Sequence, residues 1–321
     1  MPGFSAFLQL IRAKNLILLG VILFCIKYCL VDPLADLSSV PPCLSNLHWL
    51  LLGMATVFIA ASGNVINDIM DQDMDRVNRP TKFIVGRSIS EPLAWNIYYA
   101  LTAVGLVCGI WLAELLNSEY HGTVFILCSA GLWFYSQYFK RQALVGNLIV
   151  SLLSALVLLL PFFMEYRCVV ADPMVASAIT DHGGKIIIHW QGFIFVFAGF
   201  SFLTTLIREI IKDMQDMSGD SEAGAATLPI TIGLKPTKWL AIFLVILLII
   251  AVGWLQFIRS NGGDQLTFYY LLIAVQIPSL VLIVLLSTSH RPQDMKAPSR
   301  LVKLIMITGI LCMFTLRYSF I

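Results

Sequence analysis

Residues 46–75 read NLHWLLLGMATVFIAASGNVINDIMDQDMD, an apolar run that ends in a cluster of acidic residues. The run from 46 to 68 is long enough to cross the roughly 30 Å of hydrocarbon in a bilayer as a helix. The acidic residues at its end are Asp68, Asp71, Asp73 and Asp75. The segment therefore predicts a membrane-spanning helix with a strongly acidic terminus.

The composition of the whole chain predicts a membrane protein with several such helices. Its 321 residues are 58% hydrophobic and 12% charged, with a mean hydropathy of +0.84, whereas an ordinary soluble domain is about 25% charged. These values exclude a disordered chain and a small secreted disulfide scaffold. The net charge of +2 gives no indication of a nucleic-acid partner. The seven cysteines form no CxxC pair and are interpreted as small core residues.

Nine apolar runs are long enough to span a bilayer, and they fill most of the chain. Only helices and closed barrels satisfy their backbone polar groups in lipid, and runs of about twenty residues have helix length. We therefore expect an all-α polytopic membrane protein, with residues 1–321 forming a single domain. The expected spans are 16–33, 46–68, 92–115, 121–139, 143–165, 189–211, 236–258, 267–287 and 299–319.

The distribution of Lys and Arg predicts the orientation of these spans. Of the 21 basic residues, 16 fall at the N-terminus or after even-numbered spans, and an excess of positive charge stays in the cytoplasm. The N-terminus is therefore expected in the cytoplasm, and the polar segment 171–185, whose role the sequence does not indicate, on the opposite side. In a bacterium the protein would lie in the inner (plasma) membrane.

The acidic residues gather in two windows, at the cytoplasmic ends of the second and sixth spans. The second window contains Glu209, Asp213, Asp216, Asp220 and Glu222. Asp68, Asp71 and Asp75 each precede an aspartate of the second window by the same 145 positions. The repeated spacing indicates a parallel pseudo-repeat with equivalent motifs at 64–87 and 208–233.

The spacing within each window places three carboxylates on one stripe of a helix. Asp68, Asp71 and Asp75 share this stripe with Asn64, because residues three or four apart lie on the same helix face. Like charges this close repel unless a positive group lies between them. Mg²⁺ suits oxygen ligands that leave room for substrate phosphate oxygens. The alternatives are solvated helix ends and an ion-coupled transporter, although a transporter usually carries an ionisable residue near mid-membrane.

Three segments resemble motifs of the UbiA superfamily of membrane prenyltransferases. Residues 64–87, NVINDIMDQDMDRVNRPTKFIVGR, are similar to its NDxxDxxxD motif with a trailing NRP. Residues 208–233, REIIKDMQDMSGDSEAGAATLPITIG, resemble its second aspartate motif, and 135–147, YSQYFKRQALVGN, resemble the segment between the two. The resemblance implies a ring of helices around a central cavity that opens to lipid, and Mg²⁺-dependent transfer of a prenyl group from its diphosphate.

Matching positions in these motifs imply a role for individual residues. Tyr135 would stabilise an allylic cation, although an aromatic residue near a span end is also a common interfacial anchor. Lys82 stands where many relatives have Arg, and it keeps the positive charge but lacks the planar guanidinium. The implied metal ligands are Asn67, Asp68, Asp71, Asp75, Asp213, Asp216 and Asp220. The implied substrate-binding residues are Arg12, Asn15, Asn64, Asn67, Arg79, Lys82, Lys140, Asn147, Arg208 and Lys212.

The second motif also discriminates between acceptors. Its REIIKD sequence, followed by Gly219–Asp220 and Thr227–Pro229, most resembles the digeranylgeranylglyceryl phosphate synthase branch of the superfamily. That resemblance implies transfer of a geranylgeranyl group to the hydroxyl of geranylgeranylglyceryl phosphate, which forms an ether lipid. Prenylation of an aromatic quinone precursor, of the hydroxybenzoate or naphthoate type, is the alternative. The sequence does not define the prenyl chain length.

Overall fold

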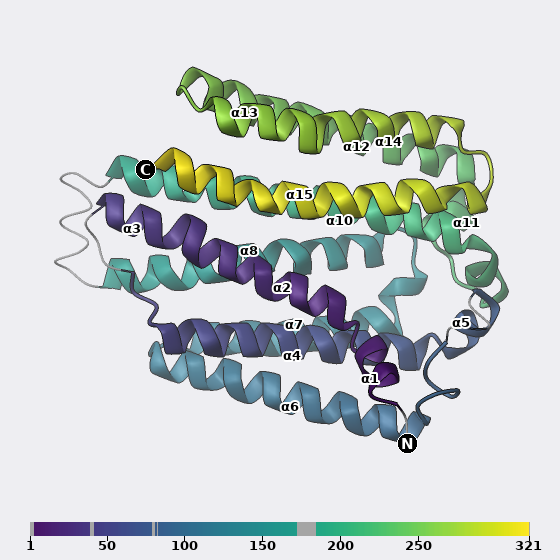
Figure 1. The fold of residues 1–321 in the computed structure, drawn as a ribbon. Coiled ribbons are helices and arrows are strands. Elements are labelled where there is room, and N and C mark those ends of the chain that lie inside the picture. The colour runs from purple at the N-terminus through teal and green to yellow at the C-terminus, as the bar shows by residue number, and fades with distance from the viewer. Residues whose placement is uncertain (1–2, 39–41, 79–80, 82, 172–183, 321) are drawn as a thin grey trace.

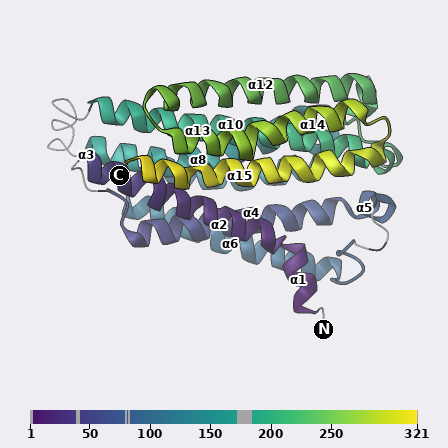
Figure 2. The same cartoon turned by 45° about the horizontal axis from the view of Figure 1, so that its top comes forward.

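The computed structural model describes residues 3–38, 42–78, 81, 83–171 and 184–320, and this part of the chain contains helices and no strand. The long helices run side by side along one direction (Figure 1), and the turned view in Figure 2 shows the same bundle. The longer elements are α2 (Ala13–Cys25), α4 (Asn46–Met70), α6 (Glu91–Leu115), α7 (Glu119–Gln137), α8 (Val145–Ala171), α10 (Gly184–Glu222), α12 (Leu234–Asn261), α14 (Ile277–Thr288) and α15 (Lys296–Phe320). The short ones are α1 (Phe4–Leu10), η1 (Ile26–Val31), α3 (Asp32–Ser38), α5 (Gln72–Asn78), η2 (Phe139–Arg141), α11 (Leu228–Ile232), α13 (Gln265–Leu271), η4 (Leu272–Gln276) and η5 (Pro292–Met295).

Each of the nine apolar runs identified in the sequence corresponds to one helix or to two or three consecutive helical elements. Eight helical segments of the described residues are long and apolar enough to cross a membrane. The exception among the nine runs is α7, which is long enough but contains polar residues such as His121, Ser129 and Ser136. The protein is therefore an all-helical integral membrane protein, and the count of nine spans stays a prediction.

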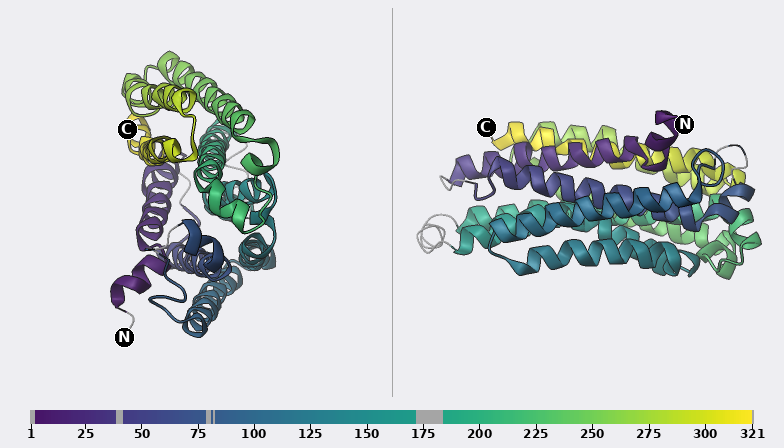
Figure 3. Two further views of the ribbon diagram at one scale, coloured as in Figure 1. Left: turned by 90° about the vertical axis from the view of Figure 1, so that its right-hand side faces the viewer. Right: turned by 90° about the horizontal axis from the view of Figure 1, so that it is seen from below.

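Six helices close a ring through their contacts. Going round, α2 contacts α4, α4 contacts α7, α7 contacts α8, α8 contacts α10, α10 contacts α15, and α15 returns to α2. The end-on view in the left panel of Figure 3 shows this ring along the helix axes. Helix α6 packs outside it against α4 and α7, and α12 to α14 pack outside it against α10 and α15. The ring is the part of the fold that surrounds the site described below.

Glycines allow two of these helix pairs to approach closely. A Cβ at Gly105 of α6 would lie 2.8 Å from Ile59 of α4, and one at Gly309 of α15 would lie 2.0 Å from the ring of Phe200 on α10. Small residues at such contacts let membrane helices pack by van der Waals attraction, since lipid supplies no hydrophobic drive between helices. Gly309 thus helps to hold α15 against α10.

The end of the bundle away from the aspartates is tied by a polar contact and a disulfide. Glu165 of α8 is fully buried and accepts hydrogen bonds from the backbone N–H groups of Cys43 (2.8 Å) and Leu44 (3.2 Å). Cys43 itself is disulfide-bonded. The interpretation of all seven cysteines as simple core residues is therefore wrong for Cys43, because an odd number of scattered cysteines does not reveal a pair that only the fold brings together.

Candidate active site

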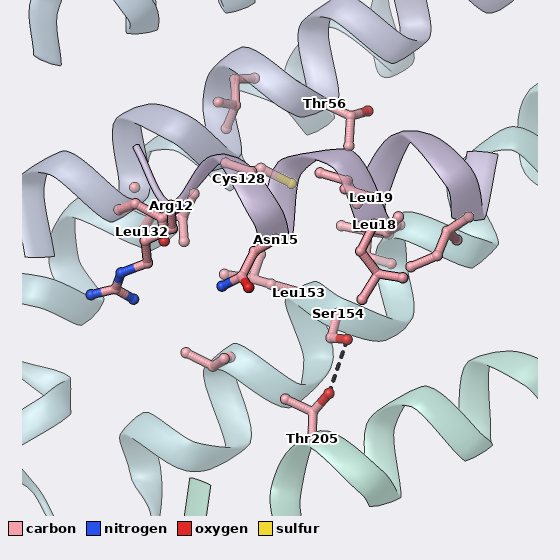
Figure 4. Close-up of a pocket in the computed structure, with 18 of the residues that line it drawn as sticks. Arg12, Asn15, Leu18, Leu19, Thr56, Cys128, Leu132, Leu153, Ser154 and Thr205 are labelled. Atoms are coloured by element: carbon pink, nitrogen blue, oxygen red, sulfur yellow. Dashed lines mark hydrogen bonds between the residues drawn. The ribbon is translucent and has the colours of Figure 1, made fainter. Parts of the chain in front are cut away.

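A cavity of about 440 Å³ lies inside the ring. Its lining residues come from α4, α7, α8, α10, α15 and the α2 segment beginning at Arg12. One end is polar, with Asn64, Asn67, Arg208 and Lys212 among its residues, and the remainder is mostly aliphatic. Figure 4 shows Arg12 and Asn15 near the start of α2, and the hydrogen bond between Thr205 of α10 and Ser154 of α8. The cavity can therefore hold a molecule with an anionic head and an apolar tail.

Arg12 reaches the first aspartate motif because the chain bends at this residue. It lies between α1 and α2 in the left-handed conformation (φ 53°, ψ 52°), which is uncommon outside glycine and asparagine. Its Nη2 then donates a hydrogen bond to Asp68 Oδ1 at 2.8 Å. Burial alone would lower the pKa of Arg12, but the Asp68 carboxylate raises it above its ordinary value. The N-terminal segment thus contributes a fixed positive charge to the site.

Asp71 ends α4 and forms the centre of a small polar network. Its Oδ2 accepts hydrogen bonds from Asn67 Nδ2 at 2.9 Å and from Lys140 Nζ. The same Lys140 ammonium donates to Asn67 Oδ1 at 3.1 Å. Asn64, one turn earlier, donates instead to the Ile11 carbonyl at 3.0 Å and holds the α1–α2 bend against α4. Lys140 is therefore a second positive group beside the first motif, in addition to Arg12.

A glycine positions Lys140. Gly146, in the first turn of α8, lies against the backbone of η2, so that a Cβ there would be 2.8 Å from the Phe139 carbonyl oxygen and 2.9 Å from Lys140 Cα. The next residue, Asn147, is buried and donates from Nδ2 to Asp213 Oδ2 at 2.8 Å. Gly146 and Asn147 at the start of α8 therefore connect residues 138–144, here called the Lys140 loop, to the second aspartate motif.

The second motif lies on an unbroken helix, unlike the first. Asp213, Asp216 and Asp220 all belong to α10, whereas the first motif is divided at Asp71 (φ −95°, ψ 5°) between α4 and α5. The buried Asp220 carboxylate accepts a hydrogen bond from Thr227 Oγ1 at 3.5 Å. The two motifs therefore differ in local structure, and their origin in an internal repeat stays a prediction.

Both motifs belong to one electrostatic cluster at one end of the bundle. Asp220 interacts with Asp71 of the first motif as well as with Lys140 and Lys212. Arg12, which is paired with Asp68, also interacts with Glu209 of α10. In Figure 1, α5, which carries Asp75 of the first motif, and α11, which follows the second motif, lie at the same end. The two acidic windows that were separated in the sequence are thus brought together.

Seven of the residues singled out in the sequence line the cavity. Tyr135 lines it, whereas the neighbouring aromatic residues Phe134 and Tyr138 are exposed. None of the six motif aspartates lines the cavity, but Asp68 is paired with Arg12 and Asp71 with Asn67, and both of these partners do. Arg79 and Lys82 lie outside the described residues, as does most of the segment 171–185. The predicted residues that line the cavity are Arg12, Asn15, Asn64, Asn67, Tyr135, Arg208 and Lys212.

Two charged lining residues were not predicted. Glu209 is buried, lines the cavity and forms an ion pair with Arg208. It belongs to the second acidic window but not to the repeated spacing, so pattern alone did not select it. Lys303 lines the cavity from α15, and a lone lysine near the end of an apolar run carries no motif that could have identified it.

The carboxylates fit Mg²⁺ in their chemistry. Asp71 Oδ1 is buried and has no hydrogen-bond partner, so its lone pairs are available to a metal ion. In the part of the chain that the structure describes, no three carboxylate, histidine or cysteine side chains gather closely enough to hold a metal ion alone.

The family model and the individual relatives found by sequence comparison agree with each other. The model of the UbiA prenyltransferase family matches residues 34–307. A digeranylgeranylglyceryl phosphate synthase from Methanobrevibacter smithii is 31% identical over 244 residues, which cover 76% of this chain and 75% of that protein. A protein of the same name from Saccharolobus solfataricus is 30% identical over 285 residues, covering 88% and 86%.

Solved structures share the fold. One, described as "Structural and mechanistic insights into the biosynthesis of Digeranylgeranylglyceryl phosphate synthase in membranes", aligns with a TM-score of 0.61 at 24% identity, covering 99% of this chain and 100% of that one. A UbiA homologue from Archaeoglobus fulgidus bound to DMAPP and Mg²⁺ aligns with a TM-score of 0.54 at 17% identity, covering 96% and 99%. Membership in a family of enzymes favours prenyl transfer over the transporter alternative. The chain belongs to the UbiA prenyltransferase family and is an integral membrane enzyme that transfers prenyl groups.

Proposed function

We propose that the protein transfers a geranylgeranyl group from its diphosphate to the hydroxyl of geranylgeranylglyceryl phosphate, in a Mg²⁺-dependent reaction that forms an ether lipid. The observation that carries the proposal is the cavity, whose polar end is lined by Arg12, Arg208 and Lys212 with Glu209, and whose remainder is mostly aliphatic. The names of the relatives support this acceptor, and the A. fulgidus homologue with DMAPP and Mg²⁺ supports the diphosphate and the metal.

The residues at the polar end would bind and orient the diphosphate. Arg12, Lys140 and Lys212 carry positive charge beside the two motifs, and such preorganised charge stabilises the negative charge that develops as the C1–O bond of the allylic diphosphate breaks. Mg²⁺ held by the aspartates would neutralise the departing diphosphate further. The metal ligands proposed are Asn67, Asp68, Asp71, Asp75, Asp213, Asp216 and Asp220.

The apolar part of the cavity would shelter the other half of the reaction. The aliphatic lining would exclude water from the allylic cation, and Tyr135 contributes an aromatic side chain to the same lining. The acceptor hydroxyl oxygen would then form the ether bond to C1 as the C1–O bond to the diphosphate breaks, and its proton would pass to the departing diphosphate.

We further propose that the aspartate end faces the cytoplasm. The excess of Lys and Arg at that end supports this orientation, and the disulfide-bonded Cys43 at the opposite end supports it independently, because disulfides persist in oxidising compartments. A membrane-impermeant maleimide applied to intact cells should label Asn261→Cys and leave Ser221→Cys unlabelled. Labelling of Ser221→Cys alone would reverse the assignment.

An acceptor screen tests the proposed activity. Purified protein in lipid, supplied with geranylgeranyl diphosphate and Mg²⁺, should prenylate geranylgeranylglyceryl phosphate. Hydroxybenzoate and naphthoate acceptors serve as the comparison, since the metal ligands would be the same for them. Product formed with an aromatic acceptor alone would replace the ether-lipid proposal with the aromatic one.

A further inference from the structure

Helix α15 contributes one charged side chain to the cavity. Its lining residues are Lys303, Met306 and Ile307, which follow each other at helical spacing on one face. The first turns of this helix also carry Lys296 and Arg300, and neither of them lines the cavity. Lys303 is therefore the one of these three basic residues that faces the substrate space.

Lys303 lies on a different wall from the cations of the aspartate motifs. Arg12 is paired with Asp68, and Arg208 with Glu209, so both of these arginines belong to the acidic end built by α4 and α10. Lys303 comes from α15, which carries no acidic residue from 296 to 320. A second anion that enters the cavity beside the diphosphate would meet positive charge on this wall.

The cavity reaches the surface at the same place. Asn15 of α2 and Lys303 of α15 both line the cavity and are both exposed, and Ile307 is 38% exposed. The two helices are neighbours in the ring, so the opening lies between them. Lys303 is seven residues from the start of α15, which places it about 10 Å along the helix from its first residue. A lipid could therefore move sideways from the bilayer into the cavity here, with its apolar tail and its head group passing between the same two helices.

We propose that Lys303, together with the Asn15 amide, binds the phosphate of the acceptor lipid at the opening between α2 and α15. This assignment rests on the proposed function, since only a phosphate-bearing acceptor needs it. An ammonium group is a common point-charge partner for phosphate, and an amide N–H adds a neutral donor. The anion held on the α15 wall would set the acceptor hydroxyl beside the prenyl diphosphate held at the acidic end.

Steady-state kinetics of Lys303→Gln distinguishes a contact with the acceptor phosphate from a general effect on activity. The KM for geranylgeranylglyceryl phosphate should rise about 10- to 100-fold, as expected for loss of a charge-assisted hydrogen bond, with the KM for geranylgeranyl diphosphate unchanged. Lys303→Arg should recover most of the loss. Lys296→Gln is the matched control, because it removes the same charge from the same helix outside the cavity, and it should leave both KM values unchanged.

Geranylgeranylglycerol, which lacks the phosphate, completes the test. Wild type should use it poorly, and Lys303→Gln should use it no worse than wild type does. The assignment is wrong if Lys303→Gln leaves the KM for the phosphate acceptor unchanged, or raises the KM for both substrates equally. Failure of the wild type itself to use any phosphate-bearing acceptor would instead show that the proposed function is wrong, and the Lys303 assignment with it.

Discussion

Substituting alanine for Gly146 should displace the Lys140 loop and reduce prenyl transfer. A Cβ at this position would lie 2.8 Å from the Phe139 carbonyl oxygen and 2.9 Å from Lys140 Cα, so the two backbones must separate by roughly half an ångström to reach ordinary contact. A shift of that size would stretch the 3.1 Å bond between Lys140 Nζ and Asn67 Oδ1 beyond hydrogen-bonding range.

The expected loss of activity follows from the hydrogen bond between Lys140 and Asn67. A hydrogen bond to a charged group contributes about 1.5–3 kcal/mol, which corresponds to a fall in kcat/KM of roughly 10- to 150-fold if Lys140 acts in the transition state. Gly131→Ala on α7 is the matched control, because a Cβ there meets nothing within 4 Å. The assay is prenyl transfer by the two variants in the same lipid, with thermal unfolding measured alongside. Equal activity of Gly146→Ala and Gly131→Ala would refute this account of how the loop is positioned.

Three further outcomes follow from the same contacts. Chelation with EDTA should stop turnover and added Mg²⁺ should restore it; full activity in EDTA would contradict the metal assignment. Arg12→Gln, which loses the 2.8 Å ion pair with Asp68, should lower kcat/KM by at least tenfold, about the effect of one charge-assisted bond, whereas the exposed Lys14→Gln should be close to wild type in the same assay. Cys43→Ser, which removes a disulfide far from the aspartates, should lower the unfolding temperature and leave kcat of the folded enzyme unchanged; a lost kcat at unchanged stability would argue against a purely structural role.

The sequence predicted the elements of this fold well because each apolar run has the length that a bilayer demands. It also predicted that Asp71 and Asp220 would meet, since helices with the same direction and the same acidic spacing bring their ends to one side. The structure confirms the helical membrane fold and places these residues in one electrostatic cluster. Tyr135 was identified by its position beside Lys140, and it lines the cavity.

Other features depend on tertiary contacts that no local pattern encodes. The break at Asp71 has no glycine or proline to mark it, and it becomes visible only where α5 turns to pack against α10. The packing of α12 to α14 outside the ring was unpredictable because uniformly apolar helices show no preferred face. Glu209 and Lys303 face the cavity because of how α10 and α15 are rotated about their own axes. Packing between the helices sets that rotation.

The central claim is that the two aspartate motifs act together on one Mg²⁺-bound diphosphate. Its most direct test is calorimetric titration of the purified protein with a thiolo analogue of geranylgeranyl diphosphate that cannot ionise, with and without Mg²⁺, for wild type, Asp71→Asn and Asp213→Asn. The account predicts tight binding by the wild type only when Mg²⁺ is present, and weakened binding for each variant although the motifs lie on different helices. The account would be contradicted if the affinity for the analogue were the same with and without Mg²⁺. It would also be contradicted if Asp71→Asn or Asp213→Asn bound the analogue as tightly as the wild type.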